Sequence, residues 1–237
     1  RVLFRYKITT DEAGNTPYTN DNSGDWELTT DANGKQYYDE ETGEKFEESD
    51  VNVAVNDGVE FTAGGTHELG DITLGDGASF TSNGDLTVKS VDGDGIAATT
   101  DGSTLTTTEE DGINVEAIDA KGDMTAKGGD VKTETASVDG ATVKAEAVTD
   151  AETGETTGGD MTVTDGGTLA NGAALEADGT MTLKGDFTST GTGDNTIKAQ
   201  TLDSKDANFA SAEGSTANTT IEAEEGDRSE ERRVGKE

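Results

Sequence analysis

Large apolar side chains recur at a nearly constant interval over the C-terminal two thirds of the chain. Successive members lie 19, 19, 19, 18, 20, 21 and 19 residues apart; they are Leu86, Leu105, Met124, Val143, Met161, Met181, Leu202 and Ile221. A fixed period of this size is typical of repeat architectures. Each member lies in a short string of alternating apolar and polar residues, which is the periodicity of a β-strand. The pattern therefore predicts an all-β fold, a β-solenoid with coils of about 19 residues.

A second, looser apolar series runs about half a period out of phase with the first. Its members are Ile96, Ile113, Val131, Val148, Leu169, Phe187 and Phe209. Two strands in each coil, separated by turns rich in Gly and Asp, would produce these two series. Coils stack about 4.8 Å apart, so the seven intervals of the first series correspond to a rod of roughly 34 Å.

The composition favours a competing interpretation, an acidic disordered segment. Leu, Ile, Val and Phe together make up 37 of 237 residues, and the formal net charge is −34. Few apolar residues combined with high net charge are typical of disorder. Against this, disordered chains are usually rich in Pro, and this chain has one. A solenoid also needs only a thin core, because stacking of its coils supplies the hydrogen bonds. The regular spacing of the apolar residues therefore favours the folded alternative.

Three regions differ in composition. Residues 1–58 hold seven of the eleven aromatic side chains, and Gly- and Asn-containing turns punctuate short strand-like pieces there, which predicts a small module of β-hairpins or a meander. Residues 59–226 carry the repeats. Residues 227–237 break every trend, and the segment from Arg228 to Glu237 resembles a translated sequencing adapter. We therefore interpret this tail as non-native.

Charge and composition also exclude some partners. A chain this acidic, without basic patches, repels the phosphates of nucleic acids, so no nucleic-acid binding is expected. No apolar run is long enough to span a membrane, and no membrane insertion is expected of this segment. Cysteine is absent, which leaves neither disulfides nor Cys metal sites.

No residue can be assigned a catalytic, cofactor-binding or metal-binding role from the sequence. His67 is the only histidine, so triads and multi-histidine sites cannot form, and we interpret it as a surface or turn residue. Carboxylates are so abundant that no particular pair can be nominated as an acid and base. The turn from Asp92 to Gly95 offers hard oxygen ligands, but calcium-loop motifs do not repeat in register. Weak, non-specific calcium binding at the turns is the expectation, with no cofactor.

One coil is interrupted by an acidic string from Asp150 to Gly158. Its composition is that of a turn, and loops that bulge from solenoid coils are common sites of function. We interpret this segment as a solvated loop projecting from one coil.

The repeats resemble a known family of bacterial proteins. Copies such as Gly70-Asp71-Ile72-Thr73-Leu74, Gly84-Asp85-Leu86-Thr87-Val88, Gly122-Asp123-Met124-Thr125-Ala126, Gly159-Asp160-Met161-Thr162-Val163 and Gly179-Thr180-Met181-Thr182-Leu183 are similar to the stalks of filamentous-haemagglutinin-like exoproteins and autotransporter adhesins. The resemblance spans about Asp71 to Glu225. It implies a right-handed parallel β-helix at the extracellular surface of a Gram-negative bacterium, associated with the outer membrane.

The function expected from this resemblance is that of a stalk. The segment would be part of a longer secreted adhesin and would display regions elsewhere that attach to a host cell, a neighbouring cell, a glycan or the matrix. It would not be an enzyme. Two alternatives remain open at this point: a β-helix carbohydrate-active enzyme such as a polysaccharide lyase or depolymerase, and a disordered acidic segment.

Overall fold

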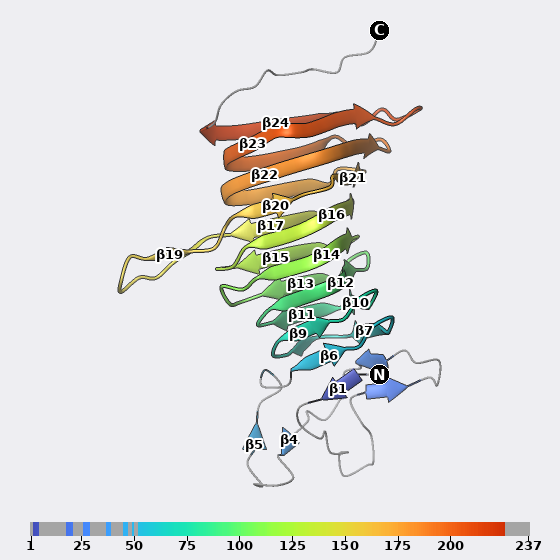
Figure 1. Cartoon of the computed structure of the whole chain (residues 1–237), viewed down its shortest axis with the longest axis vertical. Coiled ribbons are helices and arrows are strands. Elements are labelled where there is room, and N and C mark those ends of the chain that lie inside the picture. Colours follow the sequence, from blue (N-terminus) through green and yellow to red (C-terminus); the bar gives the residue numbers. More distant parts are fainter. Residues whose placement is uncertain are drawn as a thin grey trace.

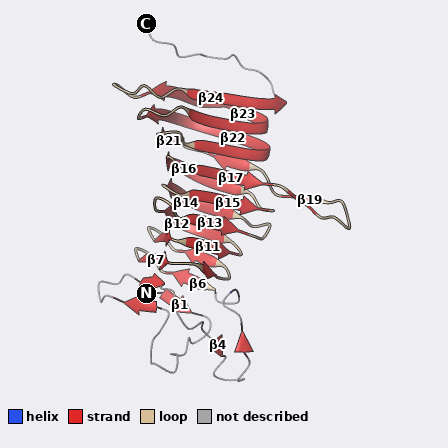
Figure 2. Ribbon diagram, turned by 180° about the vertical axis from the view of Figure 1, so that it is seen from behind, coloured by secondary structure: helices blue, strands red, loops and turns tan. Residues whose placement is uncertain are grey.

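The computed structural model describes residues 52–225 continuously, together with Ser49 and the backbone of five short strands nearer the N-terminus. The described part of the chain is all-β, with 65% of its residues in strands, and consists of about nine parallel stacked coils with a spacing of about 20 residues. Figure 1 shows the coils rising in sequence order along one axis, and Figure 2 shows the same stack from behind. The predicted β-solenoid is confirmed.

Each coil has three faces, which we number in the order in which the chain meets them after residue 59. Face 1 contains β7 (Glu60–Gly64), β10 (Ser79–Asn83), β21 (Gly167–Ala170) and the C-terminal parts of β12 (Val91–Thr99), β14 (Ile113–Ala120), β16 (Val131–Asp139), β22 (Ala174–Thr190) and β23 (Asn195–Ser211). The central coils have two strands each, as predicted: β12 with β13 (Thr104–Thr107), β14 with β15 (Asp123–Lys127), and β16 with β17 (Thr142–Glu146). The longer strand of each pair turns a corner and continues along the next face, so two strands form three faces.

Face 2 contains β8 (His67–Glu68), β11 (Asp85–Val88), β13 (Thr104–Thr107), β15 (Asp123–Lys127), β17 (Thr142–Glu146), the N-terminal parts of β22 and β23, and β24 (Thr219–Glu225). Face 3 contains β6 (Val53–Val55), β9 (Ile72–Leu74), β20 (Met161–Val163), the N-terminal parts of β12, β14 and β16, and the middle of β22 and β23. All these pairings are parallel, and the register shifts only within the β12–β14 and β22–β23 pairs. The first solenoid strand, β6, begins at Val53, before the boundary predicted at residue 59.

The lumen is filled by columns of inward side chains from all three faces. On face 2, Leu86, Leu105, Met124 and Val143 stack directly on one another and are at most 1% exposed. On face 1, the rings of Phe61 and Phe80 stack with centroids 5.6 Å apart, and those of Phe187 and Phe209 with centroids 5.2 Å apart. Alternation of inward and outward side chains thus buries a continuous, narrow core along the whole rod.

The first apolar series does not follow a single column. Val143 on face 2 pairs with Leu175, whereas Met161 pairs with Val131 on face 3. The reason is an insertion in this coil, which makes the sequence interval from Val143 to Met161 resemble one full turn. The last members are also less buried: Leu202 is half-buried and Ile221 is 44% exposed.

The residues of the second series are also divided, between two faces of the solenoid and the insertion. Ile113 and Val131 belong to face 3, and Leu169, Phe187 and Phe209 to face 1, while Val148 lies in the insertion. Ile96 points outward and is 37% exposed, and its neighbour Ala97 fills the lumen instead. Small residues occupy several inward positions of face 1, so a search for large apolar side chains finds that face incompletely.

The five short N-terminal strands are β1 (Val2–Phe4), β2 (Tyr18–Asn20), β3 (Trp26–Leu28), β4 (Tyr37–Tyr38) and β5 (Lys45–Phe46). β2 and β3 form an antiparallel pair, as do β4 and β5, which agrees with the predicted hairpins. β1 pairs with β6 and β3 pairs with β7, so these strands extend the sheet at the first coil. The tail from residue 227 lies outside the described residues.

A matched pair of glycines tests how closely the coils approach. Gly112 and Gly77 have nearly the same left-handed φ, 61° and 62°, but a side chain at Gly112 would collide with the backbone of Asp130 in the next coil, whereas nothing lies within 4 Å at Gly77. We expect Gly77→Ala to cost about 1 kcal/mol, the strain of the backbone conformation. Gly112→Ala should cost about 3 kcal/mol, because it also forces the two coils apart. Chemical denaturation of both variants measures the difference, and equal losses would contradict it.

A substitution at Thr107 is expected to increase the stability of the protein. Its side chain is completely buried on face 2 above Val88, and its hydroxyl has no hydrogen-bond partner. Thr107→Val should therefore stabilise the protein by about 1 kcal/mol, since it removes an unsatisfied polar group at constant shape. The control is Thr99→Val, because the buried hydroxyl of Thr99 donates to the carbonyl of Gly122 at 2.7 Å and accepts from its N–H at 3.1 Å. That control should destabilise, and thermal melts that rank the two variants in the other order would refute the argument.

Candidate functional site

His67 lies at the start of β8 and is 8% exposed. Its Nε2 is 3.0 Å from the carbonyl oxygen of Gly64, in the turn that precedes the strand. The interpretation of His67 as a surface residue was therefore wrong, although its position beside the Gly-rich turn is as expected. The side chain lies below Leu86 in the stack, which makes it part of the packing at the first corner.

The segment from Asp92 to Gly95 forms part of β12, at the point where the pairing with β14 shifts register. The carboxylate of Asp92 accepts a hydrogen bond of 2.6 Å from the side-chain amide of Asn114 in the next coil. No group of three or more His, Cys, Asp or Glu side chains in the described part of the chain is placed to hold a metal ion. Weak calcium binding at the turns stays a prediction.

The Asp residues of the Gly-Asp motifs connect neighbouring coils. Oδ1 of Asp123 accepts from the backbone N–H of Thr142 at 2.8 Å, and Oδ1 of Asp160 accepts from that of Thr180 at 2.7 Å. Asp85 accepts from the hydroxyl of Thr104 at 3.1 Å. Each carboxylate thus satisfies a polar group at the corner where the next coil begins its strand. The repeated motif is explained by coil stacking, without a ligand.

The predicted loop is an antiparallel hairpin that projects from the side of the rod, as Figure 1 shows. It consists of β18 (Val148–Thr149) and β19 (Thr156–Thr157). In its turn, Oδ1 of Asp150 accepts hydrogen bonds from the N–H groups of Glu152 and Thr153, at 2.8 and 2.6 Å. These bonds to the ionised form lower the pKa of Asp150.

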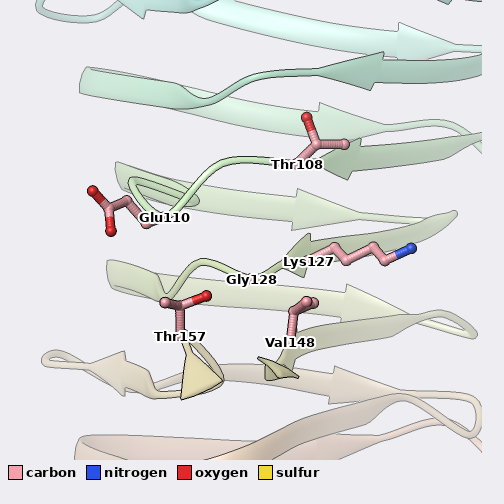
Figure 3. A pocket seen from close by; sticks show the side chains of 6 residues that line it. All are labelled: Thr108, Glu110, Lys127, Gly128, Val148 and Thr157. Carbon is pink, nitrogen blue, oxygen red and sulfur yellow. The ribbon is translucent and has the colours of Figure 1, made fainter. Parts of the chain in front are cut away.

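A shallow groove of about 350 Å³ lies where the hairpin leaves the rod. Figure 3 shows the side chains around it, which come from the turn after β13, the end of β15 and the hairpin: Thr108, Glu110, Lys127, Gly128, Val148 and Thr157. The lining offers one carboxylate, one ammonium group and two hydroxyls beside an apolar patch. Sequence reasoning missed this groove because its residues are far apart in the chain and have no motif in common.

One ion-pair cluster spans two coils near the hairpin. Nζ of Lys144 lies 3.4 Å from Oε2 of Glu146 and 3.5 Å from Oδ2 of Asp178. Burial lowers the pKa of Lys144, but the charges of Asp178 and Glu146 outweigh it and raise the pKa overall. The ammonium group therefore stays charged at neutral pH, which makes it an ion-pair partner rather than a nucleophile.

The aromatic side chains of the described solenoid face the lumen. Phe61, Phe80 and Phe187 are at most 2% exposed, and Phe209 is half-buried in the last coils. Sugar-binding clefts usually rely on exposed aromatic platforms, and these four rings are not placed to provide one.

Comparisons with protein families, curated proteins and solved structures found no match for this chain. In the part of the chain that the structure describes, no helix is long and apolar enough to cross a membrane. The stacked parallel coils define the class of this protein, a parallel β-solenoid.

Proposed function

We propose that this chain is a structural stalk of a secreted bacterial surface adhesin, which holds binding regions elsewhere in the protein away from the cell. The observation that carries the proposal is the stack of about nine coils around a continuous apolar lumen. At about 4.8 Å per coil, such a stack is roughly 40 Å long. The Gly-Asp and Thr repeats, which resemble those of filamentous-haemagglutinin-like and autotransporter stalks, support the same role.

The physical properties of the rod suit a spacer. Every coil contacts only its neighbours, so length is set by the number of coils. The corner carboxylates and the apolar columns together fix the coils in register. The net charge of −34 keeps neighbouring rods apart in solution. Attachment to a host cell, a neighbouring cell, a glycan or the matrix is assigned in this proposal to regions outside this chain.

The hairpin β18–β19 allows the location to be tested. Residues 149–157 are exposed, so antibodies raised against a peptide of this segment should label intact cells that make the protein. Labelling that appears only after the cells are permeabilised would place the protein inside and refute an extracellular stalk.

Replacement of the rod tests the spacer role directly. In the complete protein, residues 59–225 would be exchanged for an unrelated β-solenoid of similar length, with a flexible Gly-Ser linker as the control. A stalk predicts that cells keep attaching with the foreign rod and attach less with the linker, at equal surface amounts. Loss of attachment with the foreign rod as well would show that this segment itself binds the target.

A further inference from the structure

The groove beside the hairpin is formed by three successive coils. One wall is the turn after β13, the floor is the corner after β15, and the other wall is the base of the hairpin β18–β19. Figure 3 shows Thr108 and Glu110 on one side of Gly128, and Val148 and Thr157 on the other. The groove is therefore a recess between two projecting segments of the rod.

The floor stays open because the corner between the walls consists of two glycines, Gly128 and Gly129. An added Cβ at Gly129 would lie 2.6 Å from Cα of Gly112 in the neighbouring coil, so no larger residue fits there. At Gly128, whose φ is 79°, an added Cβ would lie 3.6 Å from the side chain of Val148 and 3.7 Å from Oγ1 of Thr157. The absent side chain of Gly128 leaves the space that forms the groove.

Hydrogen bonds fix both walls to the rod. The N–H of Thr108 donates to the carbonyl of Lys89 at 3.2 Å. Where the hairpin leaves the rod, the N–H of Ala147 donates to the carboxylate of Asp178 in the next coil at 3.2 Å. A recess that is already formed loses less conformational freedom when a ligand enters, so its contacts contribute more to affinity.

The two ends of the groove differ in charge. In Figure 3, Glu110 and Thr157 lie at one end, and the ammonium group of Lys127 points away from them at the other. Glu110 has no ion pair, and Oγ1 of Thr157 has no hydrogen bond, among the described residues. A carboxylate and a hydroxyl without partners favour a ligand that is positively charged and donates hydrogen bonds. The net charge of −34 attracts such a ligand.

An arginine side chain has the shape and the chemistry that this groove requires. Its planar guanidinium group carries several N–H donors, which can reach a carboxylate and a hydroxyl at the same time. Its methylene stem packs on apolar surface, here Val148, which is half-buried. Because the groove is shallow, a small molecule would make few contacts in it, whereas a polypeptide would also contact the exposed hairpin, residues 149–157.

We propose that this groove binds an arginine side chain of another protein. The guanidinium group lies between Glu110 and Thr157, and the methylene stem crosses Gly128 to reach the apolar end of the groove. The residues that flank the arginine lie along the hairpin. Lys127 repels the guanidinium group from the other end, which fixes the direction in which the side chain enters. This inference does not depend on the stalk proposal.

The first test compares N-acetyl-arginine amide with N-acetyl-citrulline amide, which has nearly the same shape without the charge. NMR spectra of the intact, isotope-labelled chain follow the backbone amides during titration at constant ionic strength. We expect the arginine probe to shift the amides that surround the groove, with saturation at millimolar concentrations, and the citrulline probe to shift them much less. Equal shifts from both probes, or shifts spread evenly over the acidic surface of the rod, would overturn the proposal.

Substitutions test whether the groove is the binding site. Glu110→Gln should weaken binding of the arginine probe about fivefold, because it removes the charge that faces the guanidinium group. Glu109→Gln changes an adjacent carboxylate outside the lining and should leave the affinity within about twofold. Gly128→Ala fills the floor and should abolish binding, whereas Gly102→Ala, at a similar φ of 73° with nothing within 4 Å, should not. Circular dichroism checks that each variant is folded, and equal effects within either pair would refute the assignment.

A longer probe distinguishes a protein partner from a small guanidinium compound. The peptide N-acetyl-Gly-Ser-Arg-Ser-Gly amide places residues on both sides of the arginine. It should bind several times more tightly than N-acetyl-arginine amide, since it also reaches the hairpin. Equal affinities would assign the groove to a small molecule and overturn the proposal of a protein partner.

Discussion

Deletion of residues 72–90 is expected to leave a shorter solenoid that still unfolds cooperatively. Ile72 and Val91 occupy the same position in successive coils, so the deletion removes one whole coil and places β12 against β6. The cost should be about 1–3 kcal/mol, the share of a domain's stability carried by a segment of this size. Thermal unfolding followed by far-UV circular dichroism measures it.

The matched control deletes residues 72–80, which is about half a coil. This shorter deletion puts Thr81 where Ile72 stood and moves every following apolar side chain away from its column. We expect loss of the cooperative transition and rapid proteolysis, although fewer residues are missing. If the half-coil deletion were tolerated as well as the full one, the register of the stack would not be what stabilises the protein.

Asn195→Ala is expected to be the most damaging single substitution at a polar position. The side chain is completely buried at a corner. Its Nδ2 donates to the carbonyl of Leu169 at 2.9 Å and to the hydroxyl of Ser189 at 2.7 Å, and its Oδ1 accepts from the N–H groups of Gly172 and Ala173 at 3.2 and 3.0 Å. The substitution leaves several buried groups without a partner, and we expect a loss of about 3–5 kcal/mol.

Asn208→Ala is the control for this prediction. The amide of Asn208 donates to Asp186 at 3.0 Å in the neighbouring coil, but this contact is exposed to solvent, and its loss should cost less than about 1 kcal/mol. Urea denaturation compares the two variants. Similar losses for both would mean that the network around Asn195 contributes no more than a surface contact.

The spacing of apolar residues was sufficient to predict the solenoid, because only a stacked strand repeat places Leu86, Leu105 and Met124 in one column. It was not sufficient to predict three faces. Face 1 places Ala97 and Ala136 in the lumen, and such small side chains do not stand out in a hydrophobic pattern. The inserted hairpin also keeps the interval from Val143 to Met161 close to one coil length. The sequence therefore did not show that these two residues belong to different columns.

The polar contacts and the groove were harder to predict from the sequence than the fold. The Gly-Asp motifs were recognised as turns, but their role as acceptors for the next coil depends on stacking geometry. No motif near Asn195 in the sequence indicates its role. Its four hydrogen-bond partners come close only after the chain has turned a corner or completed a coil. The groove beside the hairpin is assembled in the same way, from segments that meet only in the folded protein.

The backbone hydrogen bonds between successive coils run along the rod axis. Tension applied between the two ends would therefore load these bonds lengthwise and peel coils from the end one after another, instead of breaking a whole sheet at once. A coil that contributes about 4.8 Å to the height of the rod would release about 20 residues, or roughly 70 Å of extended chain. A rod built in this way would lengthen in small steps when force is applied suddenly, and it would return to its original length when the coils restack.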